Sequence, residues 1–218
     1  MQPTITAFAW VPEFARTCVR DMRPRWAFEE TGQSYAVRVL AGDAVKSAAE
    51  RCHQPFGQVP SYADDNEIFE SGAICLHIAR SAPGLLPDDR AATARAEQWV
   101  IAALNSVEPF VMAVAVNDLF EADQPWSKDR HPKVIADLHT RLADLSAALG
   151  DKTWLHGDMF TVGDLVMIHV LRGALGGPIE EFPNLAAYVA RGEARPAYQR
   201  ALAAHLADFT DSPQPAQI

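Results

Sequence analysis

The feature that most constrains the fold is a change of pattern part-way along the chain. Up to residue 82, alternating apolar patterns typical of strands are mixed with helical patterns, whereas after residue 87 every long pattern is helical. The segment 83–87 contains two prolines and a glycine, which interrupt regular structure. We therefore expect an α/β domain over 1–82, a linker over 83–87 and an all-helical domain over 88–210. The tail 211–218, with two further prolines, is expected to be disordered.

The first part has a regular order of elements. Its strands are expected at 5–10, 35–40, 59–63 and 67–69, and its helices at 14–31, 44–52 and 71–80. The resulting order is β-α-β-α-β-β-α. Pro24 lies inside the first of these helices and is expected to kink it. In the second part we expect helices at 88–120, 132–149, 161–175, 184–195 and 196–209.

The composition argues against several classes of function. With 49% hydrophobic and 22% charged residues, the chain has an ordinary globular composition. Its net charge of −9 argues against a general nucleic-acid binder, because phosphate contacts need clustered lysine and arginine. The three cysteines form no CxxC pair, which fits a reducing compartment and argues against structural zinc. The seven histidines lack metal-ligand spacing, so we expect no metal.

We expect a cytoplasmic protein that does not enter a membrane. The N-terminus has no basic region followed by an apolar run, so it does not read as a signal peptide. The most apolar long stretch, 99–116, contains Asn105, Glu108 and Pro109. A membrane-spanning helix needs about 20 mostly apolar residues, so this stretch is interpreted as a buried core helix.

Two short motifs in the first part are suited to binding a small peptide. Proline cannot donate to a sheet, so Val59-Pro60 belongs at the start of a strand. If the bond between them is cis, the Val59 backbone groups turn away from ordinary pairing and can receive an extended peptide. Glu70 and Ser71 lie at a predicted helix N-terminus, where Ser71 and free amides suit a carboxylate. The Glu70 carboxylate suits an ammonium group.

The combination of PFGQVP, a ten-residue gap and ESGAI resembles the cytosolic glutathione transferase family of bacterial type, without indicating one class. The resemblance spans almost the full chain and implies a thioredoxin-like N-terminal domain followed by a helical domain. It implies that Val59 pairs with the cysteinyl part of glutathione and that Pro60 is the cis-proline. It also assigns Glu70 and Ser71 to the γ-glutamyl end, and Gln58 to the glycyl end.

A further resemblance to this family lies in the helical part. Thr161 and Asp164 have the spacing of a capping box, in which two side chains satisfy the donors of a helix N-terminus. Phe160 and Leu165 are placed for the accompanying hydrophobic staple. This motif is structural, and we expect it to stabilise the fold without touching a ligand.

The chain departs from the family pattern where a tyrosine, serine or cysteine usually contacts the glutathione sulfur. Between residues 10 and 18 there is no tyrosine or serine. The candidates for activating the thiol are Arg16, Thr17 and, lining the site, Trp10. Cys18 is a further candidate activator, which would make the chemistry redox through a mixed disulfide. Alternatively the first helix uses only its backbone amides.

Two interpretations of neighbouring residues complete this picture. The run of arginines at positions 16, 20, 23 and 25 is expected to form a solvated basic face, with Arg16 the exception worth testing. Phe14, Val111, Met112 and Ala115 are candidates for an apolar co-substrate pocket, although helical apolar spacing usually indicates core.

The sequence therefore predicts a glutathione transferase that adds the glutathione thiolate to an electrophilic apolar co-substrate. Two alternatives stay open: a glutathione-dependent peroxide or disulfide reductase, and a non-catalytic binding module of the same fold. The resemblance also implies a homodimer.

Overall fold

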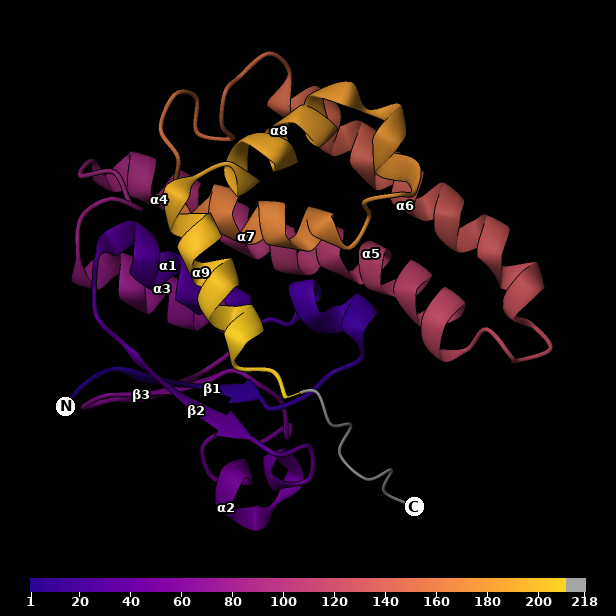
Figure 1. The fold of residues 1–218 in the computed structure, drawn as a ribbon. Helices are drawn as coiled ribbons and strands as arrows, with labels where there is room; N and C mark the ends of the chain where they lie inside the picture. Colours follow the sequence, from indigo (N-terminus) through magenta and orange to yellow (C-terminus); the bar gives the residue numbers. More distant parts are fainter. Residues whose placement is uncertain (211–218) are drawn as a thin grey trace. The chain divides into compact units, whose positions relative to one another are not determined.

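The computed structural model describes residues 1–210, and the expected disordered tail 211–218 lies outside the described residues (Figure 1). The chain divides into two compact units. The first consists of Met1–Leu85 together with residues 195–210, and the second is Leu86–Ala194.

The first unit contains a four-stranded sheet in the order β2-β1-β3-β4. The strands are β1 (Thr4–Phe8), β2 (Ala36–Leu40), β3 (Ser61–Ala63) and β4 (Glu67–Phe69). β1 pairs in parallel with β2 and antiparallel with β3, and β3 pairs antiparallel with β4. β1 is central, which explains why Ile5, Thr6 and Ala7 are all buried.

Helices cover both faces of this sheet. They are η1 (Glu13–Cys18, 3-10), α1 (Met22–Thr31), η2 (Ala44–Lys46, 3-10), α2 (Ala48–Arg51), α3 (Ser71–Ser81) and α9 (Pro196–Ala207). Figure 1 shows α1 and α3 together on one side of the sheet and α2 on the other. The predicted order β-α-β-α-β-β-α is confirmed, as is the thioredoxin-like class of this unit.

The single helix expected over 14–31 is wrong. The chain forms η1, leaves helical structure around Val19, and begins α1 at Met22. Pro24 is therefore the third residue of α1, where a backbone N–H has no intrahelical acceptor in any case. The first bond of the helix runs from the Arg25 N–H to the Asp21 carbonyl at 3.2 Å, so the proline does not interrupt the ladder.

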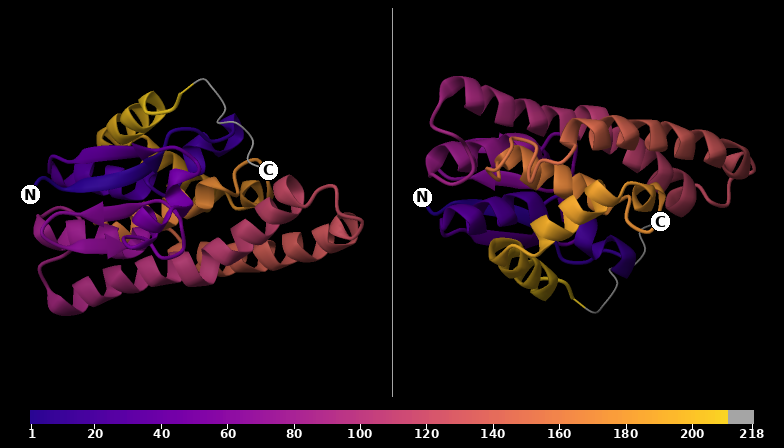
Figure 2. Two further views of the ribbon diagram at one scale, coloured as in Figure 1. Left: turned by 90° about the horizontal axis from the view of Figure 1, so that it is seen from below. Right: turned by 90° about the horizontal axis from the view of Figure 1, so that it is seen from above.

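The helix α9 belongs to the first unit, which differs from the expected boundary of a helical domain over 88–210. It lies beside α1 in each view (Figure 1, Figure 2). The Tyr198 ring packs edge-on against Trp26, with 4.9 Å between ring centroids. Arg195 donates two hydrogen bonds to Glu30, at 2.6 and 2.7 Å. These contacts join segments that are far apart in sequence.

The second unit is helical, as predicted. Its elements are α4 (Arg90–Ala102), η3 (Ala103–Val107, π), α5 (Glu108–Ala115), η4 (Val116–Phe120, π), α6 (Ser127–Leu149), α7 (Val162–Arg172), η5 (Pro178–Glu181, 3-10) and α8 (Pro183–Glu193). Residues 162–171 of α7 are all buried, so α7 is the central helix of this unit.

The continuous stretch Arg90–Phe120 is long and apolar enough to cross a membrane by length and composition alone, and 28% of its apolar window is buried. The buried positions include Ala96, Val100, Ala103 and Val107. They recur every three or four residues and so share one helix face. The elements of this stretch pack on α7, and this face is therefore part of the core of its unit.

Candidate ligand site in the N-terminal unit

Val59 presents unpaired backbone groups at the entrance to β3. The Val59–Pro60 peptide bond is cis. Within residues 1–210, the Val59 N–H and C=O take part in no hydrogen bond. The Val59 side chain is buried with Leu40 and Val45, which holds the backbone in place. An extended peptide can therefore pair with this residue as an added strand.

Glu70 and Ser71 form a polar end to α3. Ser71 is the first residue of this helix and is buried, whereas Glu70 is exposed. The first hydrogen bond of the helix runs from the Ile74 N–H to the Glu70 carbonyl at 2.9 Å, so the three preceding amides have no acceptor within the helix. Such amides, with the positive end of the helix dipole, bind anions.

The backbone of Glu70 is strained. Its φ of 71° lies in the left-handed region that side chains other than glycine rarely adopt. Strain of this kind costs about 1–3 kcal/mol and is concentrated at functional sites. Here it accompanies the change of direction from β4 into α3, at the residue whose carboxylate is free to reach a ligand.

The pairing of β3 with β4 brings the two motifs together. Ser61 lies opposite Phe69 in this antiparallel pair. Val59 lies two residues before Ser61, and Ser71 lies two residues after Phe69. The unpaired backbone of Val59 and the N-terminus of α3 therefore lie at the same end of the strand pair.

Arg23 was missed as a member of this site. Its Nη1 donates a hydrogen bond to the Ser71 Oγ at 3.0 Å, and both side chains are buried. The expectation of a solvated basic face is wrong for this residue, which is 2% exposed, and for Arg25, which is 1% exposed. For Arg25 the sequence offers one signal, because Asp21 lies four residues before it and forms an i,i+4 ion pair with it.

The Arg16 side chain points toward Phe209, which follows α9. Its guanidinium lies over the Phe209 ring, 5.5 Å from the centroid. The other two candidates, Trp10 and Thr17, are half-buried, and the Thr17 Oγ1 lies 4.0 Å from the Cys18 Sγ. For Arg16 this arrangement favours a packing role.

Cys18 ends η1 as an exposed thiol. The following residue, Val19, packs against the cluster formed by Leu40, Val45 and Val59. This contact anchors the chain next to Cys18 on the cluster that contains Val59. Of the other cysteines, Cys52 is exposed, and burial raises the pKa of Cys75 to about 12.

The loop before Val59 is held by a residue that the sequence analysis did not single out. The Gln54 side chain is buried, and its Oε1 accepts a hydrogen bond from the Phe56 N–H at 2.7 Å. Gln58 itself is exposed, as a residue contacting a ligand must be. His53 is engaged by Glu67, with 2.9 Å between Nδ1 and Oε2.

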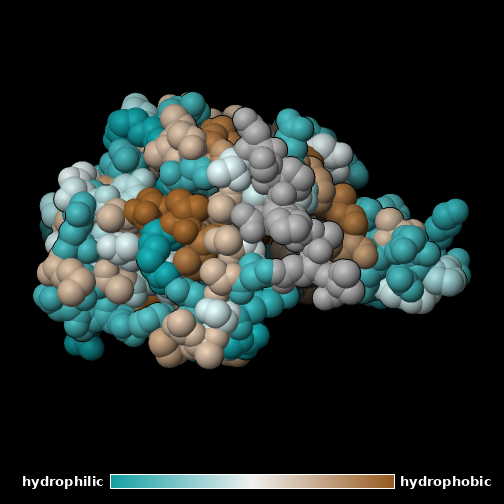
Figure 3. Space-filling model, turned by 60° about the horizontal axis from the view of Figure 1, so that its bottom comes forward, coloured by the Kyte–Doolittle hydropathy of each residue, from teal (hydrophilic) through white to brown (hydrophobic). Residues whose placement is uncertain are grey.

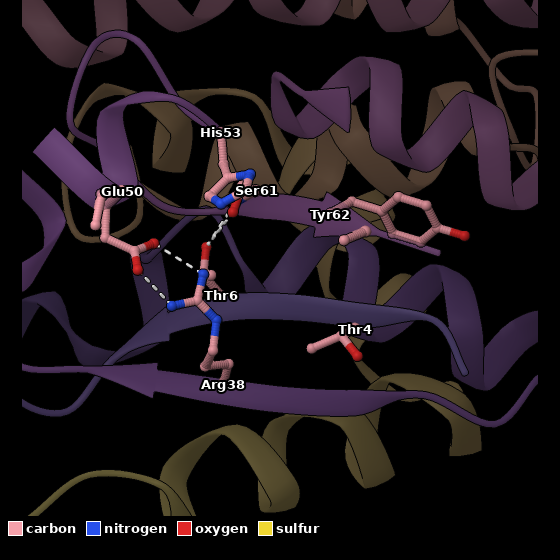
Figure 4. A pocket seen from close by; sticks show the side chains of 9 residues that line it. Thr4, Thr6, Arg38, Glu50, His53, Ser61 and Tyr62 are labelled. Carbon is pink, nitrogen blue, oxygen red and sulfur yellow. Dashed lines mark hydrogen bonds and ion pairs between the residues drawn. The ribbon is translucent and has the colours of Figure 1, made fainter. Parts of the chain in front are cut away.

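A separate hollow of about 370 Å³ lies on the sheet beside α2 (Figure 4). Two pairs of its polar side chains contact one another: the Arg38 Nη2 donates to Glu50 at 2.8 Å, and the hydroxyls of Thr6 and Ser61 lie 3.0 Å apart. Val59 and Ser71 are not among its lining residues. In the described part of the chain, no group of three or more His, Cys, Asp or Glu is placed to hold a metal.

The candidates for an apolar pocket differ in exposure. Phe14 on η1 is 57% exposed and Met112 is 36% exposed, whereas Val111 is buried in the core of its unit and Ala115 is half-buried. On the face seen in Figure 3, hydrophobic side chains lie in several separate places among hydrophilic ones. By their exposed fractions, Phe14 and Met112 are each accessible to solvent, and Val111 is not.

The capping box is present at the start of α7. The Asp164 Oδ2 accepts hydrogen bonds from the Thr161 N–H and Oγ1, both at 2.9 Å. Its Oδ1 accepts from the Leu155 N–H at 2.8 Å and the Tyr188 hydroxyl at 2.9 Å. Burial raises the pKa of Asp164, and these four bonds oppose that rise. Asp164 thus has a larger structural role than a two-residue box implies.

Comparisons with known proteins give a consistent result. Residues 14–85 match the family model described as glutathione S-transferase, N-terminal domain, and residues 108–196 match that of the C-terminal domain. Glutathione S-transferase GstA of Escherichia coli O157:H7 is 31% identical over 157 residues, covering 69% of this chain and 75% of the relative. Glutathione S-transferase F10 of Arabidopsis thaliana is 32% identical over 121 residues, covering 51% and 55%.

Solved structures share the fold. A glutathione transferase family member from Pseudomonas fluorescens Pf-5, with two glutathione bound, has a TM-score of 0.81 at 20% identity and covers 92% of each chain. A glutathione transferase from Burkholderia graminis, with two glutathione molecules bound per subunit, has a TM-score of 0.81 at 22% identity and covers 99% of this chain and 90% of that one.

Proposed function

The chain belongs to the glutathione S-transferase family, and from this premise we propose that it binds glutathione in the N-terminal unit and transfers the glutathione sulfur to an electrophile. The co-substrate is a small apolar electrophile, in keeping with the exposed Phe14 of the N-terminal unit. The biological role that follows is detoxification of such compounds.

The observation that carries this proposal is that Val59 and Ser71 lie at the same end of the β3–β4 pair. There the unpaired backbone of Val59 can accept the cysteinyl part of glutathione as an added strand. Ser71 and the α3 amides bind the γ-glutamyl carboxylate, Glu70 binds the γ-glutamyl ammonium group, and Gln58 reaches the glycyl end. One tripeptide satisfies all of these groups.

Calorimetric titration with glutathione tests this assignment. Hydrogen bonds to charged groups contribute about 1.5–3 kcal/mol, so Glu70→Ala and Ser71→Ala should each weaken binding by roughly ten- to hundredfold. Glu67→Ala is the matched control, because Glu67 is an exposed acid at the opposite end of β4. Unchanged affinity in both site variants would exclude this site.

A second candidate function is glutathione-dependent reduction of a disulfide or peroxide. It is favoured by the exposed thiol of Cys18 beside Val19, which packs on the Val59 cluster. In the disulfide reaction, the Cys18 thiolate attacks one sulfur of the substrate and releases the other as a thiolate. Glutathione then attacks the substrate-derived sulfur of the mixed disulfide, freeing Cys18, and a second glutathione releases the substrate thiol and forms glutathione disulfide.

Two substitutions distinguish transfer from reduction. Cys18→Ser should abolish disulfide reduction and leave the transfer of glutathione to an aryl chloride measurable. Thr17→Val should impair transfer if the Thr17 hydroxyl donates to the glutathione sulfur. Disulfide reduction that persists in Cys18→Ser contradicts the redox candidate.

We further propose that the protein is a cytoplasmic homodimer. Exposed hydrophobic side chains on the stretch Arg90–Phe120, such as Ile101 at 59%, support an association between copies. The exposed thiols of Cys18 and Cys52 suit a reducing compartment. Sedimentation equilibrium of the purified protein should give twice the mass of the chain, and a monomer at micromolar concentration contradicts the proposal.

A further inference from the structure

His205 joins α9 to both ends of the segment that carries Cys18. This histidine is 1% exposed. Its Nε2 lies 2.6 Å from the carbonyl oxygen of Arg16, and its Nδ1 lies 3.0 Å from the Asp21 Oδ2. Residues 16 and 21 bracket the segment 17–20, in which η1 ends and regular helix has not yet begun.

We propose that His205 is a positioning residue for the thiol chemistry, acting as a bridge that holds the segment 17–20 in place. The inference rests on the proposed function, because this segment carries Cys18 and leads into the N-terminus of α1. It assigns to α9 a part in the site of the N-terminal unit.

The hydrogen-bond partners of His205 define its role. A backbone carbonyl can only accept, so the Nε2 facing Arg16 carries a proton. The Asp21 Oδ2 already accepts a hydrogen bond from the Arg25 Nε at 2.9 Å and acts as a carboxylate oxygen toward Nδ1. Both ring nitrogens of His205 therefore face an oxygen acceptor, one at each end of the segment 17–20.

Asp21 is held by Arg25 as well as by His205. Arg25 also donates from its Nη2 to the Asp208 Oδ2 at 2.6 Å. Asp21 and Arg25 are almost completely buried. A buried polar group is costly when it loses a hydrogen-bond partner, so removing the histidine takes one partner from the buried Asp21 carboxylate. The bridge consequently depends on this side chain rather than on general packing of α9.

The residues that follow α9, Phe209 and Thr210, also contact the connection between β1 and α1. The Phe209 ring packs edge-on against His205, with 4.9 Å between centroids, and lies beneath the Arg16 guanidinium. The Thr210 N–H donates to the carbonyl oxygen of Ala9 at 2.9 Å. The end of the described chain therefore runs along the β1–α1 connection from Ala9 to Asp21.

The segment 17–20 is held from a second direction by Val19, which packs on the cluster containing Val59. Position matters here because a displacement of about 1 Å between reacting groups can cost roughly a hundredfold in rate. Loss of His205 should therefore lower the rate of the thiol reaction more than it lowers the affinity for glutathione, whose contacts at Glu70 and Ser71 are untouched.

Two substitutions of His205 should impair its bridge to different degrees. His205→Gln keeps one amide donor and can satisfy one acceptor, whereas His205→Leu can satisfy neither. Arg200→Ala is the control, because Arg200 also joins α9 to α1, through Glu29 at 2.7 Å, without touching the segment 17–20. The measurements are hydrogen exchange of the free protein, glutathione affinity by calorimetry, and kcat and KM with 1-chloro-2,4-dinitrobenzene.

We expect His205→Leu to speed exchange of the 17–20 amides and to lower kcat at least about tenfold, with the glutathione Kd changed by less than about threefold. His205→Gln should lie between it and the native protein, and Arg200→Ala should match the native protein. If His205→Leu does not fold, the exchange rates and kcat of His205→Gln alone decide whether His205 holds the segment 17–20.

Unchanged exchange and kcat in His205→Gln and His205→Leu would overturn the inference, as would an equal loss in Arg200→Ala. Failure of the native protein to bind glutathione refutes the proposed function instead, and the exchange data still decide whether His205 holds the segment.

Discussion

Replacing Asp164 with alanine should destabilise the helical unit well beyond the effect of a lost helix cap. A cap contributes about 0.5–2 kcal/mol, and the sequence motif alone predicts a loss of that size. The buried carboxylate, however, accepts four hydrogen bonds from three residues: Leu155, Thr161 and Tyr188.

The magnitude follows from what the alanine leaves behind. The buried N–H groups of Leu155 and Thr161 lose their acceptor, at about 1–3 kcal/mol each. The two hydroxyls can rotate toward other partners and lose about 0.5–1.5 kcal/mol each. Together these four losses lower the free energy of unfolding by at least about 3 kcal/mol. Because the neighbouring groups can relax partly around the alanine, we expect the total loss to stay within about 3–6 kcal/mol.

Urea unfolding followed by circular dichroism measures this loss. Asp164→Asn should lie between alanine and the native protein, because its oxygen serves one pair of donors while its amide faces the other. Asp144→Ala removes an exposed acid from α6 and should change stability by less than about 0.5 kcal/mol. A loss below about 1 kcal/mol in Asp164→Ala would refute the reasoning, as would weaker glutathione binding at unchanged stability.

Three further predictions concern the N-terminal unit. A thiol reagent at pH 8 should modify two cysteines of the folded protein and three after unfolding, because burial raises the pKa of Cys75 to about 12; reaction of all three in the native state contradicts this. The hydrogen bond from Tyr62 holds the pKa of Asp64 at about 2, so the folded state favours the ionised form, and stability should fall as pH drops from about 4 toward 2. Asp64→Asn should flatten that dependence in urea unfolding, and an unchanged slope would argue against it. Arg23→Gln should weaken glutathione several-fold by releasing the Ser71 hydroxyl, but not an analogue whose γ-glutamyl carboxylate is an amide; equal losses for both ligands would exclude this role.

Local motifs carried much of the fold prediction. The order of elements along the chain follows from local patterns, and the capping box follows from the spacing of Thr161 and Asp164. The position of Val59 and Ser71 at one end of the β3–β4 pair is likewise local, because this short strand pair lies between them in the sequence.

Contacts between segments that are far apart in the sequence could not be predicted from local motifs. Arg23 and Arg25 look like surface residues until Ser71 and Asp208 supply their partners. Beside the break after Cys18, His205 of α9 lies within hydrogen-bond distance of the Arg16 carbonyl, and helical periodicity does not predict such a contact. The placement of α9 with the first unit has the same cause, since its partners lie on α1.

The most direct test of the central claim is the ionisation of bound glutathione. Ultraviolet absorption of the thiolate, titrated against pH with protein in excess, reports the pKa of the glutathione sulfur at the site. A free thiol has a pKa of about 8.5, and the proposed site should lower this value by at least about one unit. A bound thiol that titrates like free glutathione would contradict a transferase and leave a protein that binds glutathione without activating it.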